Sequence, residues 1–192
     1  MKEHEHVVPL GDKSITLRDF EAVDLGAVLD FANALPRHDL LFLSRDIRHP
    51  KVIAAWRDAI ADGMIKTQLA YDGNRVVGST AIVSDPLGWS AHVADIRLLI
   101  AEDYRGLGLG RLLLKQCIET TLEDRIEKLI ARMTPDQRGA IALFEEMGFR
   151  GEAMLRDHVK DADGNLHDLA ILSLNVANAA THRQMLGLAD PD

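Results

Sequence analysis

The sequence predicts an α/β fold of the α+β type, formed by a single domain. Strand-like apolar runs and helical patterns follow one another in the order β, α, α, β, β, β, α, β, α, β, β. Two pairs of strand-like runs are joined by turns rich in Asp, Gly and Asn, which predicts two β-hairpins. Another strand-like run passes through alternating glycines directly into a leucine-rich helical pattern. At 192 residues the chain has the length of one well-packed domain.

The N-terminal region predicts a polar segment, a strand and a helix. Residues 1–13 are polar, and we expect a flexible N-terminus there. A metal site formed by the run Glu3-His4-Glu5-His6 is the alternative. Ser14–Arg18 predicts a short first strand. Asp19 suits the N-cap of a helix whose apolar residues recur at helical spacing until Pro36 ends it.

The segment from Arg37 to Pro50 mixes apolar residues with charges and two histidines. We interpret it as a cover over the core, and the alternative is one wall of a binding pocket. Pro50 suits the first turn of a second helix, which has one apolar face and ends at Gly63.

The middle of the chain predicts a hairpin, a strand and a helix. Ile65–Tyr71 and Arg75–Val83 are strand-like, and the turn between them contains Gly73, which tolerates a positive φ. His92–Ile100 predicts the strand before the glycines, and Leu109–Leu122 predicts the helix after them. Cys117 falls on the inner face of that helix, which favours a small core residue over a nucleophile.

The C-terminal third predicts a strand, a helix and a final hairpin. Ile126–Met133 is the strand, and Gln137–Met147 is a helix that Gly148 closes. Phe149–Val159 and Leu166–Leu174 form the hairpin. We expect residues 176–192 to be a C-terminal tail.

The composition is typical of a soluble globular protein, with 47% apolar and 27% charged residues. A net charge of −8 disfavours nucleic acid as a partner and suits a cationic one. The apolar runs are far shorter than the ~18 residues that a membrane span needs, and no basic-then-apolar leader opens the chain. The single cysteine cannot form an internal disulfide, and nothing indicates a zinc framework. We therefore expect a cytoplasmic protein without membrane contact or bound metal.

Three alternating glycines, Gly106, Gly108 and Gly110, predict an anion site. Because they have no Cβ atom, backbone N–H groups can converge on a bulky anion at the positive end of a helix. A P-loop would need a following Lys-Ser/Thr pair, and a dinucleotide fingerprint would need an early βαβ unit with an acidic residue about 20 residues later. Neither is present. The expected ligand is a phosphate or pyrophosphate, and the alternative is close packing of a helix end.

Two segments resemble the GNAT superfamily, the acyl-CoA-dependent N-acyltransferases. Arg105-x-x-Gly108-x-Gly110 is similar to its pyrophosphate loop, R/Q-x-x-G-x-G/A, and Gly139 to Phe149 is similar to its late segment, N-x-x-A-x-x-L-Y-x-x-x-G-F. With the element order, the resemblance covers residues 14–175, the expected N-acetyltransferase domain. It implies the GNAT fold, a mixed and mostly antiparallel sheet of six to seven strands flanked by helices.

The resemblance also implies where acetyl-CoA binds. The strand ending at Ile100 would diverge from the next strand, and its backbone would pair with the pantetheine arm as an added strand does. Backbone N–H groups from Gly106 to Arg111 would hold the pyrophosphate, and two arginines would add charge near the phosphates. The residues predicted to bind acetyl-CoA are Leu98, Leu99, Ile100, Arg105, Gly106, Leu107, Gly108, Leu109, Gly110, Arg111, Gln137 and Phe144.

The late segment departs from the superfamily pattern at two positions. Phe144 stands where a tyrosine is usual, and Gln137 stands for the usual asparagine. Phe144 has no proton to give the departing thiolate, so water or Tyr104 would supply it, or none is needed. A thiol of pKa ~8.5 is a tolerable leaving group.

Asp95 is the predicted general base, because some protein lysine acetyltransferases of the superfamily carry a base glutamate at the matching strand position. An alkylammonium of pKa ~10.4 must lose a proton before it attacks. Strand alternation places Asp95, Arg97 and Leu99 on one face. The alternative is a salt bridge between Asp95 and Arg97. For His92, His158 and His167 we favour surface or hairpin roles over catalysis.

The resemblance implies an N-acetyltransferase that moves an acetyl group from acetyl-CoA to a primary amine by direct attack in a ternary complex. The acceptor is either a protein lysine or α-amine, or a small amine, with a slight preference for the lysine type. The alternative is a non-catalytic acyl-CoA-binding sensor or regulatory module of the same fold. The oligomeric state is left open, with a homodimer as one option.

Overall fold

One mixed sheet organises the chain, and helices cover both of its faces. The computed structural model describes residues 5–43, 45–124 and 126–176. Within these ranges eight strands form the sheet in the order β1-β2-β3-β4-β5-β6-β8-β7. Neighbouring strands are antiparallel except for β5 and β6, which are parallel. The predicted α+β class and the mostly antiparallel sheet are therefore confirmed. The sheet has eight strands, whereas six to seven were expected.

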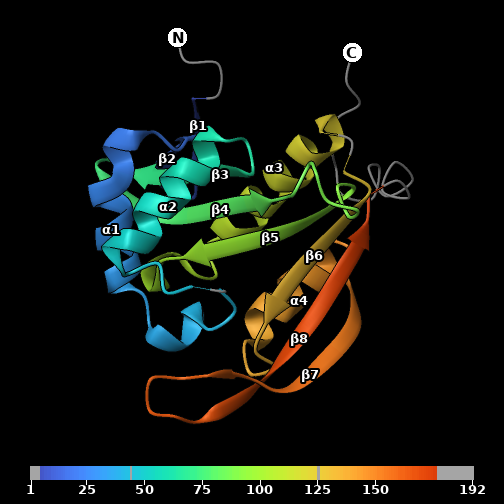
Figure 1. Cartoon of the computed structure of the whole chain (residues 1–192). Helices are drawn as coiled ribbons and strands as arrows, with labels where there is room; N and C mark the ends of the chain where they lie inside the picture. The colour runs from blue at the N-terminus through green and yellow to red at the C-terminus, as the bar shows by residue number, and fades with distance from the viewer. Residues whose placement is uncertain (1–4, 44, 125, 177–192) are drawn as a thin grey trace.

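The strands are β1 (His6–Leu10), β2 (Lys13–Asp19), β3 (Ile65–Asp72), β4 (Arg75–Val83), β5 (Val93–Ile100), β6 (Lys128–Met133), β7 (Arg150–Lys160) and β8 (Leu166–Asn175). The α-helices are α1 (Leu25–Ala34), α2 (Pro50–Ala61), α3 (Leu109–Glu123) and α4 (Arg138–Glu146). Helices α1 and α2 lie on one face of the sheet, and α3 and α4 lie on the other (Figure 1). Both predicted hairpins are present as β3–β4 and β7–β8.

The additional strand comes from the segment expected to be a flexible N-terminus. The expectation for residues 1–13 is wrong for His6–Leu10, which forms β1 and pairs antiparallel with β2. Gly11 has a φ of +63° and closes the tight turn between them, and Leu10 is buried in the core. Residues 1–4, which include most of the Glu3-His4-Glu5-His6 run, lie outside the described residues, as does the predicted tail from residue 177 onward.

The first helix begins later than predicted, because Asp19 ends β2 instead of capping a helix. A 3-10 turn at Ala22–Asp24 precedes α1, and the side chains of Glu21 and Asp24 form a capping box around it. Asp24 is buried, and its carboxylate accepts hydrogen bonds from Arg18 and from the Tyr71 hydroxyl at 2.9 Å. A buried carboxylate needs such partners, which a reading of periodicity alone does not reveal.

The core divides into two apolar clusters. Ile15, Leu17, Val28 and Leu69 belong to the first cluster, which also includes residues of α2 and of the first half of α3. The second cluster lies between the sheet and helices α3 and α4, and contains Cys117, whose thiol pKa burial raises to about 12. The interpretation of Cys117 as a core residue fits this position. Among the described residues, no helix is long and apolar enough to cross a membrane.

Strands β5 and β6 pair over only part of their length. Their parallel register runs from Val93 opposite Lys128 to Ile96 opposite Ala131 and stops there. On its other side β5 stays paired with β4 as far as Ile100. Figure 1 shows β5 and β6 diverging from this point. Among the described residues, the stretch from Arg97 to Ile100 therefore has one backbone edge without a strand partner, as the resemblance to the superfamily implied.

Candidate active site

Two cavities meet at β5, and we name them by size. The large cavity, of about 840 Å³, lies where β5 and β6 diverge and extends along the glycine loop to α4. The small cavity, of about 250 Å³, lies between α2 and strands β3, β4 and β5. Leu99 lines both cavities. A molecule in one can therefore approach a molecule in the other at the unpaired part of β5.

The glycine loop has the backbone conformation that an anion site requires. Gly106 and Gly108 have φ values of +74° and +94°, in the left-handed region that favours glycine. Gly108 is the N-cap of α3, whose first N–H groups have no partner within the helix. A Cβ atom at Gly110 would lie 3.0 Å from Leu143 of α4, so this glycine permits close packing there. Close packing therefore applies to Gly110, and the anion site at the other two glycines stays a prediction.

Most of the residues predicted to bind acetyl-CoA line the large cavity. Those that line it are Leu98, Leu99, Ile100, Arg105, Gly106, Gly108, Gly110, Arg111, Gln137 and Phe144. Leu107 is 49% exposed and Leu109 is fully buried, and neither lines the cavity. Their predicted contribution was through backbone N–H groups, which stays a prediction.

Four arginines line the large cavity, of which the sequence analysis singled out two. Arg105 is held by Asp39 at 2.6 Å and by the carbonyl oxygen of Ile100. Arg111 pairs with Glu146 of α4. Arg132 and Arg138 also line the cavity and were missed. They lie on β6 and α4, far along the chain from the glycine motif, and no local pattern marks them.

Asp95 does not form the salt bridge with Arg97 that the sequence suggested as its alternative role. Its carboxylate accepts a hydrogen bond from Arg132 on β6 instead. Burial raises the pKa of Asp95, and the charges of Arg132 and Arg97 oppose this in part. Asp95 is 16% exposed and lines neither cavity. Its role as a base stays a prediction.

Two aromatic residues that line the large cavity, Tyr104 and Phe144, contact other residues of the chain. The Tyr104 hydroxyl donates to Asp72 and accepts from Lys13 at 3.1 Å, so its proton is engaged away from the cavity. Phe144 is buried and packs edge-on against Phe149, with ring centroids 5.0 Å apart. Packing is therefore the role that this geometry supports for Phe144.

One histidine that the sequence analysis did not single out lines the large cavity. His38 Nε2 lies 2.6 Å from an Asp136 carboxylate oxygen and 3.3 Å from the Thr134 hydroxyl. His167 lies edge-on to it, and its Nε2 is 2.9 Å from Asp161. The sequence gives no signal for this cluster, since His38 lies about a hundred positions or more from its partners in the C-terminal part of the chain. His92 and His158 are exposed, as expected.

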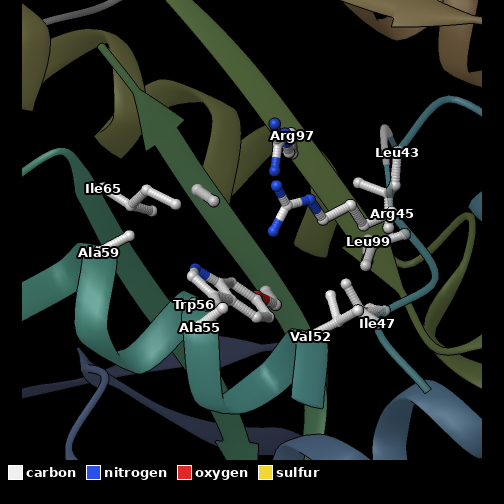
Figure 2. A pocket seen from close by; sticks show the side chains of 12 residues that line it. Leu43, Arg45, Ile47, Val52, Ala55, Trp56, Ala59, Ile65, Arg97 and Leu99 are labelled. Atoms are coloured by element: carbon white, nitrogen blue, oxygen red, sulfur yellow. The ribbon is translucent and has the colours of Figure 1, made fainter. Parts of the chain in front are cut away.

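The small cavity is lined by an apolar wall and by two guanidinium groups. Its wall comes mainly from α2, including Val52, Ala55 and Trp56, and from Leu99 of β5. Arg97 of β5 and Arg45 of the segment before α2 both line this cavity on the side away from the Trp56 indole (Figure 2). The Trp56 N–H donates to Thr67 at 3.1 Å, so the indole presents an apolar surface.

The segment before α2 forms part of this cavity. Leu40 and Ile47 are buried in the core, while Leu43, Arg45 and Ile47 line the small cavity. The interpretation as core cover fits Leu40 and Ile47, whereas the role of the segment as the wall of a binding pocket stays a prediction. Within the described ranges, no three or more His, Cys, Asp or Glu side chains gather in a way that would hold a metal ion.

Comparison with known proteins supplies the family context. Residues 36–149 match the acetyltransferase (GNAT) family. The fold is similar to that of a GNAT-family acetyltransferase from Streptococcus pneumoniae, with 21% identity, a TM-score of 0.71 and coverage of 84% of this chain and 99% of that one. It is also similar to a ribosomal-protein-alanine N-acetyltransferase from Brucella melitensis, with 24% identity, a TM-score of 0.72 and coverage of 83% and 98%.

A third solved structure was determined with ligands. This is a spermidine N-acetyltransferase from Vibrio cholerae in complex with CoA and spermine, with 18% identity and a TM-score of 0.71. The similarity covers 85% of this chain and 96% of that one. At these identities the similarity shows a common fold only. The acceptors in the names of these structures belong to those proteins and are not carried over to this chain.

Proposed function

The chain belongs to the acetyltransferase (GNAT) family, and from this premise we propose that it transfers an acetyl group from acetyl-CoA to a primary amine in a ternary complex. The observation that carries the proposal is the unpaired edge of β5 from Arg97 to Ile100, which leads to the glycine loop at α3. One end suits a pantetheine arm and the other a pyrophosphate. The spermidine N-acetyltransferase of similar fold contains CoA.

The donor residues act by position and charge. Backbone N–H groups at the start of α3 point toward the pyrophosphate, and Arg105, Arg111 and Arg138 lie along the same cavity with positive charge. From the loop, the arm follows β5 backwards from Ile100 to the point where β6 joins it. The thioester then lies beside Arg97, at the meeting of the two cavities.

The amine approaches from the small cavity and attacks the thioester carbonyl with its lone pair. The new C–N bond forms, the C–S bond breaks, and CoA leaves as a thiolate. One proton leaves the amine nitrogen, and one proton reaches the sulfur from water, because Phe144 has none to donate and the Tyr104 proton is held by Asp72. The acceptor in this proposal is a protein lysine or α-amine, or a small amine.

Asp95 is our candidate for the group that accepts the amine proton. It lies on the same strand face as Arg97, and burial raises its pKa, which makes the carboxylate a better base. Since Asp95 lines neither cavity, we propose that it acts through a water molecule.

Acetyl transfer over a broad panel of amines and peptides tests the proposal. The panel contains free amino acids, amino-acid amides, polyamines and lysine peptides, and each reaction is followed by release of free CoA and by mass spectrometry of the acetylated product. We expect CoA release that depends on one class of amine. The alternative, a sensor that binds acyl-CoA without turnover, predicts saturable acetyl-CoA binding by calorimetry and no CoA release with any member of the panel.

A further inference from the structure

Arg97 is a half-buried cation that forms no ion pair within the part of the chain that the structure describes. No described residue forms a hydrogen bond or salt bridge with its guanidinium group, because Asp95, the neighbouring carboxylate on the strand face, pairs with Arg132. Burial lowers the pKa of Arg97. The negative charge of Asp95 opposes this shift, and the positive charge of Arg132 adds to it. A buried charge without a partner is costly, so this position favours an anion supplied from outside the chain.

A second unpaired cation faces the same place. Arg45 lines the small cavity together with Arg97, and it too makes no ion pair with any residue that the structure describes (Figure 2). Two cations that line one small cavity favour a ligand that carries negative charge. Their planar, forked donors match the two oxygens of a carboxylate.

The rest of the small cavity sets the size and character of the ligand. Its volume of about 250 Å³ is below the roughly 300–1,000 Å³ of sites for drug-sized ligands, so the occupant is small. Opposite the arginines, Val52, Ala55 and Trp56 present an apolar surface. A polyamine has no group for the two arginines, and its own positive charge would be repelled by them.

We propose that the acceptor is a small amine that also carries a carboxylate and an apolar side chain, that is, a free apolar α-amino acid. The carboxylate binds Arg45 and Arg97, the side chain packs against Trp56, and the α-amine points along β5 toward the thioester. This assignment rests on the proposed acetyl transfer and deepens it by naming the acceptor class.

The same two cations also help the chemistry. An amine attacks only in its neutral form, and nearby positive charge disfavours the ammonium form. Arg45 and Arg97 therefore hold the carboxylate and lower the pKa of the neighbouring ammonium group at once. Both are binding residues for the acceptor in this assignment.

The test compares leucine with leucinamide, which has the same side chain and amine but no carboxylate. Spermidine and an N-blocked lysine peptide complete the set, and kcat and KM are measured for each with saturating acetyl-CoA. We expect kcat/KM for leucine to exceed that for leucinamide by about 10- to 100-fold, the effect of one or two charged hydrogen bonds. This preference would run against the lower basicity of the amide's amine, which leaves more of it neutral.

Two variants and one control assign the effect to the arginines. Arg97→Gln and Arg45→Gln should each raise KM for leucine by about 10-fold or more and leave leucinamide nearly unchanged. Arg45 is exposed, so its replacement does not endanger the fold. The control is Arg57→Gln on α2, whose side chain pairs with Asp58 and does not line the cavity. It should keep the wild-type preference.

The outcomes separate the two proposals. If leucinamide, spermidine or the lysine peptide is acetylated as well as leucine by the wild-type protein, the acceptor assignment is wrong and acetyl transfer stands. Equal losses for leucine and leucinamide in both arginine variants would also overturn it. If no amine releases CoA, acetyl transfer itself fails, and the acceptor assignment fails with it.

Discussion

Asp95 of β5 pairs with Arg132 of β6, across the sheet, and not with Arg97 on its own strand. The parallel register places Asp95 opposite Ile130, so that Arg132, two residues further on, reaches back to it on the same sheet face. The consequence is that Arg97 lines the small cavity without a hydrogen-bonded ion pair to any residue that the structure describes. This one ion pair therefore affects both the candidate base and the charge of the proposed acceptor site.

The role of Asp95 can be tested by pH profiles. If its carboxylate accepts the amine proton, Asp95→Asn should lower kcat at pH 7 by about 100-fold, the low end for a general base because it acts through water. Arg132→Gln keeps the carboxylate but removes a charge that lowers its pKa. The acid limb of kcat should then move to higher pH. Unchanged turnover of Asp95→Asn at pH 7 would exclude Asp95 as the base.

The glycine loop can be tested by donor binding. Gly108→Glu forces a side chain into a backbone conformation with φ of +94° and adds negative charge where a pyrophosphate is expected, so we predict an acetyl-CoA Kd at least about 100-fold weaker in calorimetry. The control is Gly164→Glu at the tip of the β7–β8 hairpin, which has φ of +89° and lines neither cavity. Equal Kd values for the two variants would argue against the loop as the donor site.

The packing role of Phe144 can be tested by measuring the stability and the turnover of one variant separately. Phe144→Leu removes ring contacts with Phe149 and should lower the free energy of unfolding by about 1–2 kcal/mol, measured by urea denaturation. Because the ring has no proton to donate, kcat should stay within about threefold of wild type, well below the 100-fold or larger effect of losing an acid catalyst. A 100-fold loss of kcat in a variant that remains folded would contradict a packing role.

We expect the protein to lose stability in acid because of the buried carboxylate of Asp24. Burial alone would raise the pKa of its carboxyl, but hydrogen bonds from Arg18, the Glu21 N–H and Tyr71 hold the pKa below its ordinary value. A lowered folded-state pKa contributes stability above the unfolded pKa of about 3.9, and that stability is lost as pH falls through the folded value. Unfolding free energies measured between neutral pH and pH 3 should therefore decline below about pH 4.

Two Asp→Asn variants, one at a buried and one at an exposed position, test whether Asp24 causes this decline. Asp24→Asn should cost about 3 kcal/mol at neutral pH, since it leaves Arg18 without a charged partner, and should flatten the decline in acid. Asp58→Asn removes an exposed carboxylate paired with Arg57 and should change stability little. An equally steep acid decline in Asp24→Asn would show that other carboxyl groups cause it.

Local chemistry explains which elements the sequence predicts. The β3–β4 hairpin follows from a turn with Gly73 between two strand-like runs, and α3 follows from its leucine pattern after Gly108. Strand β1 is missed because His6–Leu10 is short and mostly exposed, and it is stabilised by pairing with β2. The start of α1 is missed because the partners that bury Asp24 include Tyr71, distant in sequence.

The candidate site likewise has one part that the sequence predicts and one part that it does not. Much of the proposed donor side lies in one continuous stretch, from Leu98 to Arg111, so a motif predicts it, whereas Arg132 and Arg138 of the same cavity carry no local signal. The proposed acceptor side combines Arg45, Trp56 and Arg97, which lie on a loop, a helix and a strand. Each of these residues looks ordinary in its own segment. Their convergence depends on the packing of α2 against the sheet, which no local pattern describes.

Hydrogen–deuterium exchange with and without acetyl-CoA tests the central claim most directly, that the donor lies along the unpaired edge of β5. The peptide covering Arg97 to Arg111 should exchange more slowly when acetyl-CoA is bound, because the pantetheine arm and pyrophosphate would engage its backbone N–H groups. The β1–β2 hairpin should be unaffected. Acetyl-CoA binding that leaves exchange in residues 97–111 unchanged would contradict this account.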